Sequence, residues 1–177
     1  MTRNRLFPEA AVLLFALTLG AGAAGETARA ADASARPAPK KVKMGLFENE
    51  LISLDELRAL QKKKTDLLIL DARSRRSYND GHLPAAEPAY DAEYYRQQEL
   101  FLKKIRRDPP DAAVSLARRM RRVPHDRPIV TYCNDDCQAS AVLLFKLKKL
   151  GFTDVRAAGE GFQSWEKKGY PVEKSLT

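Results

Sequence analysis

Two continuous apolar runs, at 66–71 and 128–132, each predict a buried strand. A run without polar alternation is typical of a strand that is covered on both faces, as in the middle of a parallel sheet. Further strands are expected at 86–90 and 152–156, where shorter apolar stretches lie close to turn-forming residues.

Helices are expected between these strands, because apolar residues recur there at helical spacing. Ser53 predicts the start of the first helix, and Glu56 completes a capping box. Val114, Val142 and Phe145 are expected to pack inward from two of the later helices. The predicted helices cover 53–64, 74–79, 91–107, 112–123, 139–150 and a short segment from 161. Strands that alternate with helices indicate one α/β domain with a mostly parallel sheet.

The N-terminal segment is expected to lie outside this domain. Arg3 and Arg5 precede an apolar stretch at 10–19, and Ala-Arg-Ala at 28–30 is typical of a signal-peptide cleavage site. The stretch is shorter than the ~20 apolar residues of a membrane span. We therefore expect an exported protein, periplasmic or secreted. The expected parts are a signal peptide at 1–30, a flexible linker at 31–44 and the domain at 45–177.

The net charge of +8 is concentrated in the segment 96–127, which holds ten basic and four acidic residues. We expect this basic helical insert to be either a solvated face or a docking surface for an acidic protein partner or an anionic membrane. Nucleic acid is a poor candidate partner, because no basic motif interleaved with aromatic residues is present.

The only two cysteines, Cys133 and Cys137, lie between the strand at 128–132 and the helix at 139–150. Free backbone N–H groups and the positive end of a helix dipole stabilise a thiolate, which is the reactive form of cysteine. A disulfide that closes so short a loop removes little chain entropy. The placement therefore predicts an active-site loop built around Cys133 rather than a structural staple.

Four segments follow one another in a set order. They are Leu70-Asp71-Ala72-Arg73, Gly81-His82-Leu83-Pro84-Ala85-Ala86, Val130-Thr131-Tyr132-Cys133 and Gly159-Glu160-Gly161-Phe162-Gln163-Ser164-Trp165. In order and spacing they resemble the sequence landmarks of the rhodanese-like (sulfurtransferase) domain family, over roughly Leu51 to Glu173. The resemblance implies a sheet of about five strands flanked by helices.

The resemblance also implies that Cys133 attacks the outer sulfur of a small thiol or persulfide donor and carries that sulfur as a persulfide to an acceptor. No cofactor or metal is implied. The backbone N–H groups of Asn134 to Gln138 are expected to point inward and stabilise the thiolate and the persulfide. Asp71 and Arg73 are expected to form an ion pair that organises the strand ends near Cys133.

The active-site loop departs from the family pattern Cys-x-x-Gly-x-Arg while keeping its length. Asp136 stands at the glycine position and Gln138 at the arginine position. Aspartate tolerates left-handed backbone better than most residues. A carboxylate ~4 Å from a thiolate repels it by about 4 kcal/mol before screening, at an effective dielectric constant of about 20. The positive end of a helix stabilises the same thiolate by only about 0.3–1 kcal/mol. We therefore expect Asp135 and Asp136 to disfavour a thiolate and anionic donors, and predict poor thiosulfate sulfurtransferase activity.

Several alternatives stay open at this point. Cys137 is either a resolving thiol for Cys133 or a small loop filler, and Asp135 and Asp136 are either capping and solvated acids or selectors for a neutral or cationic donor. A metal site is not expected, because no histidine neighbours the loop. His82 is expected to pack as a turn residue. The chain is then a sulfurtransferase, a thiol–disulfide redox protein that uses both cysteines, or a binding module without catalytic activity.

Overall fold

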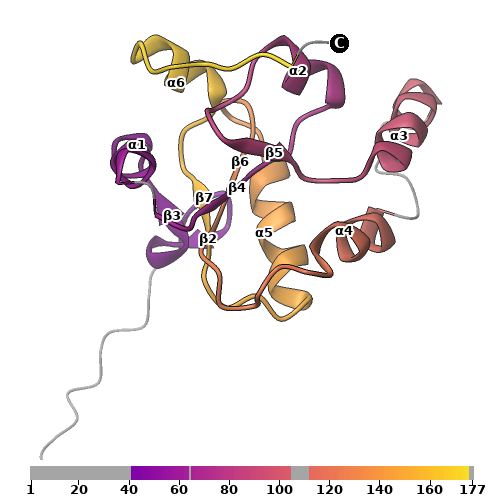
Figure 1. Cartoon of the computed structure of the whole chain (residues 1–177), viewed down its shortest axis with the longest axis horizontal. Helices are drawn as coiled ribbons and strands as arrows, with labels where there is room; N and C mark the ends of the chain where they lie inside the picture. Colours follow the sequence, from indigo (N-terminus) through magenta and orange to yellow (C-terminus); the bar gives the residue numbers. More distant parts are fainter. Residues whose placement is uncertain (1–40, 64, 105–111, 176–177) are drawn as a thin grey trace, which may run out of the picture. The chain divides into compact units, whose positions relative to one another are not determined.

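The computed structural model describes residues 41–63, 65–104 and 112–175. Its centre is a sheet of five parallel strands in the order β3-β7-β6-β4-β5. Figure 1 shows this sheet in the middle of the domain, with helices around it. The strands are β3 (Leu51–Ile52), β4 (Leu68–Asp71), β5 (Ala86–Pro88), β6 (Ile129–Tyr132) and β7 (Val155–Ala158). The α/β class and the five-stranded sheet are as predicted, and all the pairings within this sheet are parallel.

Six α-helices are described. Ser53 accepts a hydrogen bond from the Glu56 N–H and so begins the first helix at the predicted residue. Gly151, with φ of +95°, follows the end of the fifth helix. The helices are α1 (Leu54–Lys62), α2 (Arg75–Asp80), α3 (Ala92–Lys104), α4 (Ala112–Met120), α5 (Ala139–Lys149) and α6 (Phe162–Lys167). Residues 108–111, between the helices predicted at 91–107 and 112–123, lie outside the described residues.

The apolar core consists of two clusters, because successive residues of a strand point to opposite faces of the sheet. Leu68, Leu70 and Ile129 join one cluster with residues of α3, α4 and α5. Ile69 and Val130 join the other cluster with residues of α1 and α6. All four residues of β4 and of β6 are buried, which explains why their sequences read as continuous apolar runs.

Three apolar residues expected in the core are exposed instead. Val114 of α4 is 58% exposed, and Val142 and Phe145 of α5 are each 44% exposed. The buried positions of α5 are Ser140, Ala141, Leu143, Leu144 and Leu147. The prediction failed because α5 carries apolar residues around most of its circumference, so periodicity alone does not identify the buried face.

An antiparallel pair that the sequence did not predict lies before the five-stranded sheet. It consists of β1 (Lys41–Lys43) and β2 (Leu46–Phe47), and a short 3-10 helix, η1 (Glu48–Glu50), follows it. The expected linker to residue 44 is therefore wrong at its C-terminal end. Met44 and Gly45 form the turn with φ of +54° and +73°. A methionine in a left-handed position gives no sequence indication of such a turn.

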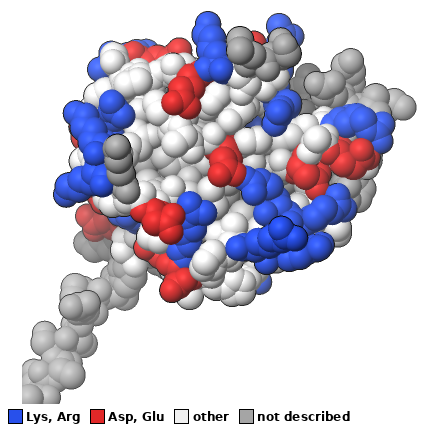
Figure 2. Space-filling model, in the orientation of Figure 1, with Lys and Arg blue, Asp and Glu red and all other residues white. Residues whose placement is uncertain are grey.

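The basic insert forms ion pairs with the rest of the domain. Arg118 contacts Asp91 at 2.8 Å, and Arg119 contacts Glu87. Arg121 and Arg122 are exposed. Figure 2 shows basic side chains beside acidic ones over much of the visible face. A docking role for the insert stays a prediction.

The signal peptide and most of the linker lie outside the described residues, so export also stays a prediction. Among the helices of the described segments, none combines the length and the hydrophobicity that a bilayer crossing requires.

Two substitutions on α5 test the assignment of its buried face. Leu144 is fully buried, so Leu144→Ala should lower the free energy of unfolding by about 2–5 kcal/mol. Val142→Ala, two residues earlier and on the exposed side, should change it by about 0.5 kcal/mol or less. Urea denaturation of both variants measures the difference, and equal losses would contradict the assignment.

Candidate active site

The carboxyl ends of β4 and β6 mark the place where the strand order of the sheet reverses. The chain leaves β4 toward β5 on one side and leaves β6 toward β7 on the other. In open parallel sheets, ligands bind at such a switch point, beyond the carboxyl ends of the strands. Asp71 ends β4, and Cys133 directly follows β6. Asp71 pairs in register with Tyr132, so the topology brings the predicted site residues to one edge.

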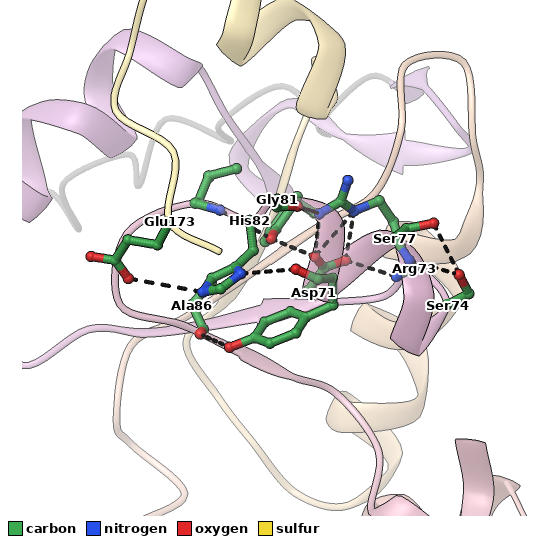
Figure 3. A network of polar contacts seen from close by, with 11 residues as sticks. Asp71, Arg73, Ser74, Ser77, Gly81, His82, Ala86 and Glu173 are labelled. Carbon is green, nitrogen blue, oxygen red and sulfur yellow. Dashed lines mark hydrogen bonds and ion pairs between the residues drawn. The ribbon is translucent and has the colours of Figure 1, made fainter. Parts of the chain in front are cut away.

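Asp71 is a fully buried carboxylate with several donors (Figure 3). Its Oδ1 accepts the Arg73 backbone N–H at 2.8 Å, and its Oδ2 accepts Arg73 Nη2 at 2.7 Å. Tyr132 Oη donates to the same Oδ2 at 2.5 Å. The predicted ion pair between Asp71 and Arg73 is present. The hydroxyl of Tyr132 adds a link to the residue directly before Cys133.

Arg73 extends this network toward the C-terminal part of the domain. Its Nη2 also donates to the Gly81 carbonyl at 2.5 Å, and its guanidinium lies 3.9 Å from the centre of the Phe162 ring. Burial lowers the pKa of Arg73, but hydrogen bonding and charge attraction to Asp71 outweigh this and raise the pKa above its usual value. Arg73 therefore stays positively charged, and its role is to hold Asp71 and the Gly81 carbonyl in place.

His82 is buried, but it lies in an isolated antiparallel bridge with Glu173 and not in the expected turn, which the structure places at Pro84 and Ala85. Its Nδ1 lies 2.9 Å from the Tyr78 carbonyl, and its ring stacks on the Tyr78 ring with centroids 3.9 Å apart. Its backbone exchanges two hydrogen bonds with Glu173 (Figure 3). These contacts anchor the C-terminal segment and give His82 a structural position.

A disulfide joins Cys133 and Cys137 across the active-site loop, with their Cα atoms 6.1 Å apart. The Cys133 residue is only 3% exposed, whereas Cys137 is partly exposed. Asp136, which stands at the family's glycine position, has φ of +54° and an exposed side chain. The loop therefore keeps the left-handed turn that the expected pattern requires. Ala85 likewise has a positive φ, of +58°.

Asp135 fastens the loop to the N-terminus of α6. Its carboxylate accepts hydrogen bonds from the Ser164 N–H at 3.1 Å and from the Ser164 hydroxyl at 2.7 Å. Partial burial raises the pKa of Asp135, but the hydrogen bonds from Ser164 outweigh this and leave the pKa below its usual range. Asp135 is thus a capping acid, one of the two alternatives left open by the sequence.

Gly161 allows the close approach between α6 and the loop. A Cβ atom at this position would lie 2.1 Å from the backbone carbon of Asn134 and from the backbone nitrogen of Asp135. The Phe162 N–H donates to the Cys133 carbonyl at 2.8 Å. Backbone contacts with α6 therefore position both ends of the Cys133–Asp135 segment.

The expected ring of inward-pointing amides is wrong in one respect. The Asp135 N–H, one of the amides from Asn134 to Gln138, donates instead to Gln163 Oε1 at 2.8 Å. The Ala139 N–H, which was not included, lies 3.4 Å from Cys137 Sγ. Because Ala139 is the first residue of α5, the helix terminus acts on Cys137.

Neither cysteine lines the hollow of about 330 Å³ formed by Arg58, Gln61, Thr65, Leu67, Ile69, Pro84 and Ala85. The strongest nucleophile that lines this hollow is the hydroxyl of Thr65. Cys133 and Cys137 therefore remain the candidate reactive residues. Within 41–63, 65–104 and 112–175, no cluster of three or more His, Cys, Asp or Glu side chains has the arrangement of a metal site.

Three residues of the site were not singled out as functional from the sequence. The sequence marks all three only as members of segments that resemble the family landmarks, and Tyr132 also as the end of a strand. The register of β4 and β6 could have indicated the contact of Tyr132 with Asp71, since both residues end neighbouring strands.

The depressed pKa of Asp135 predicts a pH-dependent contribution to stability. A carboxylate whose folded pKa lies below its unfolded value of about 3.9 stabilises the fold above that value and loses this effect as pH falls through the folded pKa. Asp135→Asn should therefore lower the free energy of unfolding at neutral pH, and its difference from the unsubstituted protein should shrink on acidification. Denaturation at several pH values checks this, and a difference independent of pH would contradict it.

Comparison with known proteins adds a family assignment to this geometry. The model of the rhodanese-like domain matches residues 53–168. A crystal structure of the BH2092 protein from Bacillus halodurans is 21% identical, with a TM-score of 0.53, and the match covers 72% of this chain and 79% of that one. A solution structure of the rhodanese-like domain of the Alr3790 protein from Anabaena sp. is also 21% identical, with a TM-score of 0.53, covering 71% and 80%.

No significant match was found among the curated proteins. The two solved structures support the fold, and the family model spans more than half of the sequence. The chain belongs to the rhodanese-like domain family.

Proposed function

We propose that the protein is a sulfurtransferase in which Cys133 carries persulfide sulfur. The observation that carries the proposal is the position of Cys133. It directly follows β6, the central strand of the sheet, at the switch point between β4 and β6. The family's catalytic cysteine stands at the corresponding place in the sequence pattern, and the family match includes this residue.

The scaffold around Cys133 suits a covalent carrier. Tyr132 is fixed by Asp71, and the Cys133 carbonyl is fixed by the Phe162 N–H. A nucleophile whose preceding residue and own backbone carbonyl are both held loses little freedom when it reacts. The rest of the loop is held by Asp135 and Gly161, so the position of the sulfur is set by backbone contacts.

The proposed reaction has two transfer steps without net oxidation. The Cys133 thiolate attacks the outer sulfur of a persulfide donor, forms a Cys133 persulfide and releases the donor as a thiolate. An acceptor thiolate then attacks the outer sulfur of Cys133, receives it and regenerates the Cys133 thiolate. Two steps with a covalent intermediate replace one difficult transfer.

The carrier cycle requires the reduced form of the loop, because a disulfide leaves Cys133 without a thiolate. Export, which the N-terminal sequence supports, would place the protein in a compartment where disulfides persist. A dithiol reductant is therefore part of the proposal, and it opens the disulfide before each series of transfers.

Thiosulfate, a small dianion with no compensating positive group, is expected to be a poor donor. Gln138 stands at the position where the family pattern has arginine, and Asp136 is an exposed acid in the same loop. Asp135 contributes less to this effect than expected from the sequence, because its carboxylate is bound by Ser164. The loop therefore favours persulfide donors over thiosulfate.

Persulfide trapping tests the carrier role of Cys133. The variant Cys137→Ser, which cannot form the disulfide, should gain the mass of one sulfur atom when incubated with glutathione persulfide. The matched double variant Cys133→Ser/Cys137→Ser should gain none, because it has no thiol. Intact-protein mass spectrometry measures both, and an unmodified Cys137→Ser protein would overturn the proposal.

The replacement of the family's arginine by Gln138 allows a second test. Gln138→Arg restores the family's arginine and should raise the rate of sulfur transfer from thiosulfate by about tenfold or more, if one new charge-assisted hydrogen bond contributes about 1.5–3 kcal/mol. The rate with glutathione persulfide should change much less. A variant that uses thiosulfate no faster than the unsubstituted protein would show that the loop charge does not select the donor.

A further inference from the structure

We infer that Cys137 gives this site a second activity, the reductive release of persulfide sulfur as sulfide. This inference rests on the proposed function, because it begins from the persulfide on Cys133. The Cys137 thiolate attacks Sγ of Cys133, the inner sulfur of the persulfide, and expels hydrosulfide. The product on the protein is the Cys133–Cys137 disulfide that the structure contains.

The loop brings the two sulfur atoms together while its ends are fixed. The Cα atoms of Cys133 and Cys137 are 6.1 Å apart, within the ~4.4–6.8 Å range that a disulfide needs. Cys133 continues from β6, and α5 begins two residues after Cys137. Asp135 between them is bound to α6. The attack therefore requires only the local turn that already holds Asp136 at positive φ.

The environment of the two cysteines assigns them different roles. The Ala139 N–H at the start of α5 lies 3.4 Å from Cys137 Sγ, and a helix of eleven residues extends behind it. A backbone donor and the positive end of a helix both favour the thiolate. The buried Cys133 is the sulfur carrier, and the partly exposed Cys137 is the internal nucleophile.

The electrons and atoms balance when a dithiol is the reductant. A donor persulfide and the Cys133 thiolate give a donor thiolate and the Cys133 persulfide. Attack by Cys137 breaks the bond between Cys133 Sγ and the outer sulfur, forms the disulfide and releases hydrosulfide. A dithiol then reduces the disulfide and becomes a disulfide itself. The net change is the reduction of one persulfide to a thiol and sulfide by two electrons from the dithiol.

The same geometry indicates where the dithiol enters. Exchange proceeds by attack of a thiolate on an accessible sulfur. Cys137 is the more exposed member of the pair, so the dithiol attacks Cys137 Sγ and the Cys133 thiolate leaves. The second thiol of the reductant then resolves the mixed disulfide and releases Cys137. Cys133 is therefore a thiolate again as soon as the dithiol has attacked Cys137, and it can accept the next sulfur before the mixed disulfide is resolved.

A single-turnover experiment without free reductant tests the inference. The full chain is reduced with dithiothreitol, desalted and mixed with one equivalent of glutathione persulfide, and both the released sulfide and the protein mass are followed. The unsubstituted protein should release about one equivalent of sulfide above a protein-free control and end as the disulfide. Val142→Ala, an exposed substitution on α5, should behave in the same way. Cys137→Ser and Cys137→Ala should retain the added sulfur and release no sulfide above that control.

The outcomes separate this inference from the function on which it rests. A stable added sulfur on the unsubstituted protein, without sulfide release, would overturn the role of Cys137 and leave the carrier function intact. Absence of added sulfur from both Cys137 variants would overturn the carrier function itself. Sulfide release by the Cys137 variants at the unsubstituted rate would also contradict an internal nucleophile.

Discussion

The buried carboxylate of Asp71 is the constraint on which the site depends. A charge removed from water costs several kcal/mol unless its environment replaces the lost hydration. Here the replacement comes from Arg73 and from the Tyr132 hydroxyl on the neighbouring strand. Because β4 ends at Asp71 and β6 ends at Tyr132, the hydrogen bond between these two residues also fixes the relative register of the two strands. Cys133 directly follows Tyr132, the last residue of β6, so its position follows from this electrostatic requirement.

The loop that follows β6 is held by contacts with α6. Asp135 binds the first turn of α6, and the missing side chain of Gly161 lets the two backbones touch. An acid that the sequence presents as a negative charge beside a thiolate is thereby turned toward Ser164. The remaining exposed acid, Asp136, occupies a turn position that glycine would fill without strain. Asp135 thus holds the loop to α6, and the proposed selection against thiosulfate is left to Asp136 and Gln138.

Much of the fold could be predicted because the strands β4 and β6 are buried on both faces and read as unbroken apolar runs. The position of Cys133 could be predicted for the same reason. The outer face of α5 could not, since Val142 and Phe145 are as apolar as the residues that pack inward. The contact between Asp135 and Ser164 joins residues 29 positions apart, and no local pattern indicates it. The direction of single N–H groups, such as those of Asp135 and Ala139, depends on the final backbone angles and is beyond sequence reasoning.

The Cys133–Cys137 disulfide connects the proposed sulfur transfer with thiol–disulfide exchange in one loop. The most direct test follows the sulfur atom itself, with a glutathione persulfide whose outer sulfur is isotopically labelled. After rapid acid quenching of the reduced protein, the proteolytic peptide that contains Cys133 should carry the label at early times, and the label should leave that peptide later. A label that never appears on this peptide, while the donor is consumed by the protein, would contradict Cys133 as the sulfur carrier.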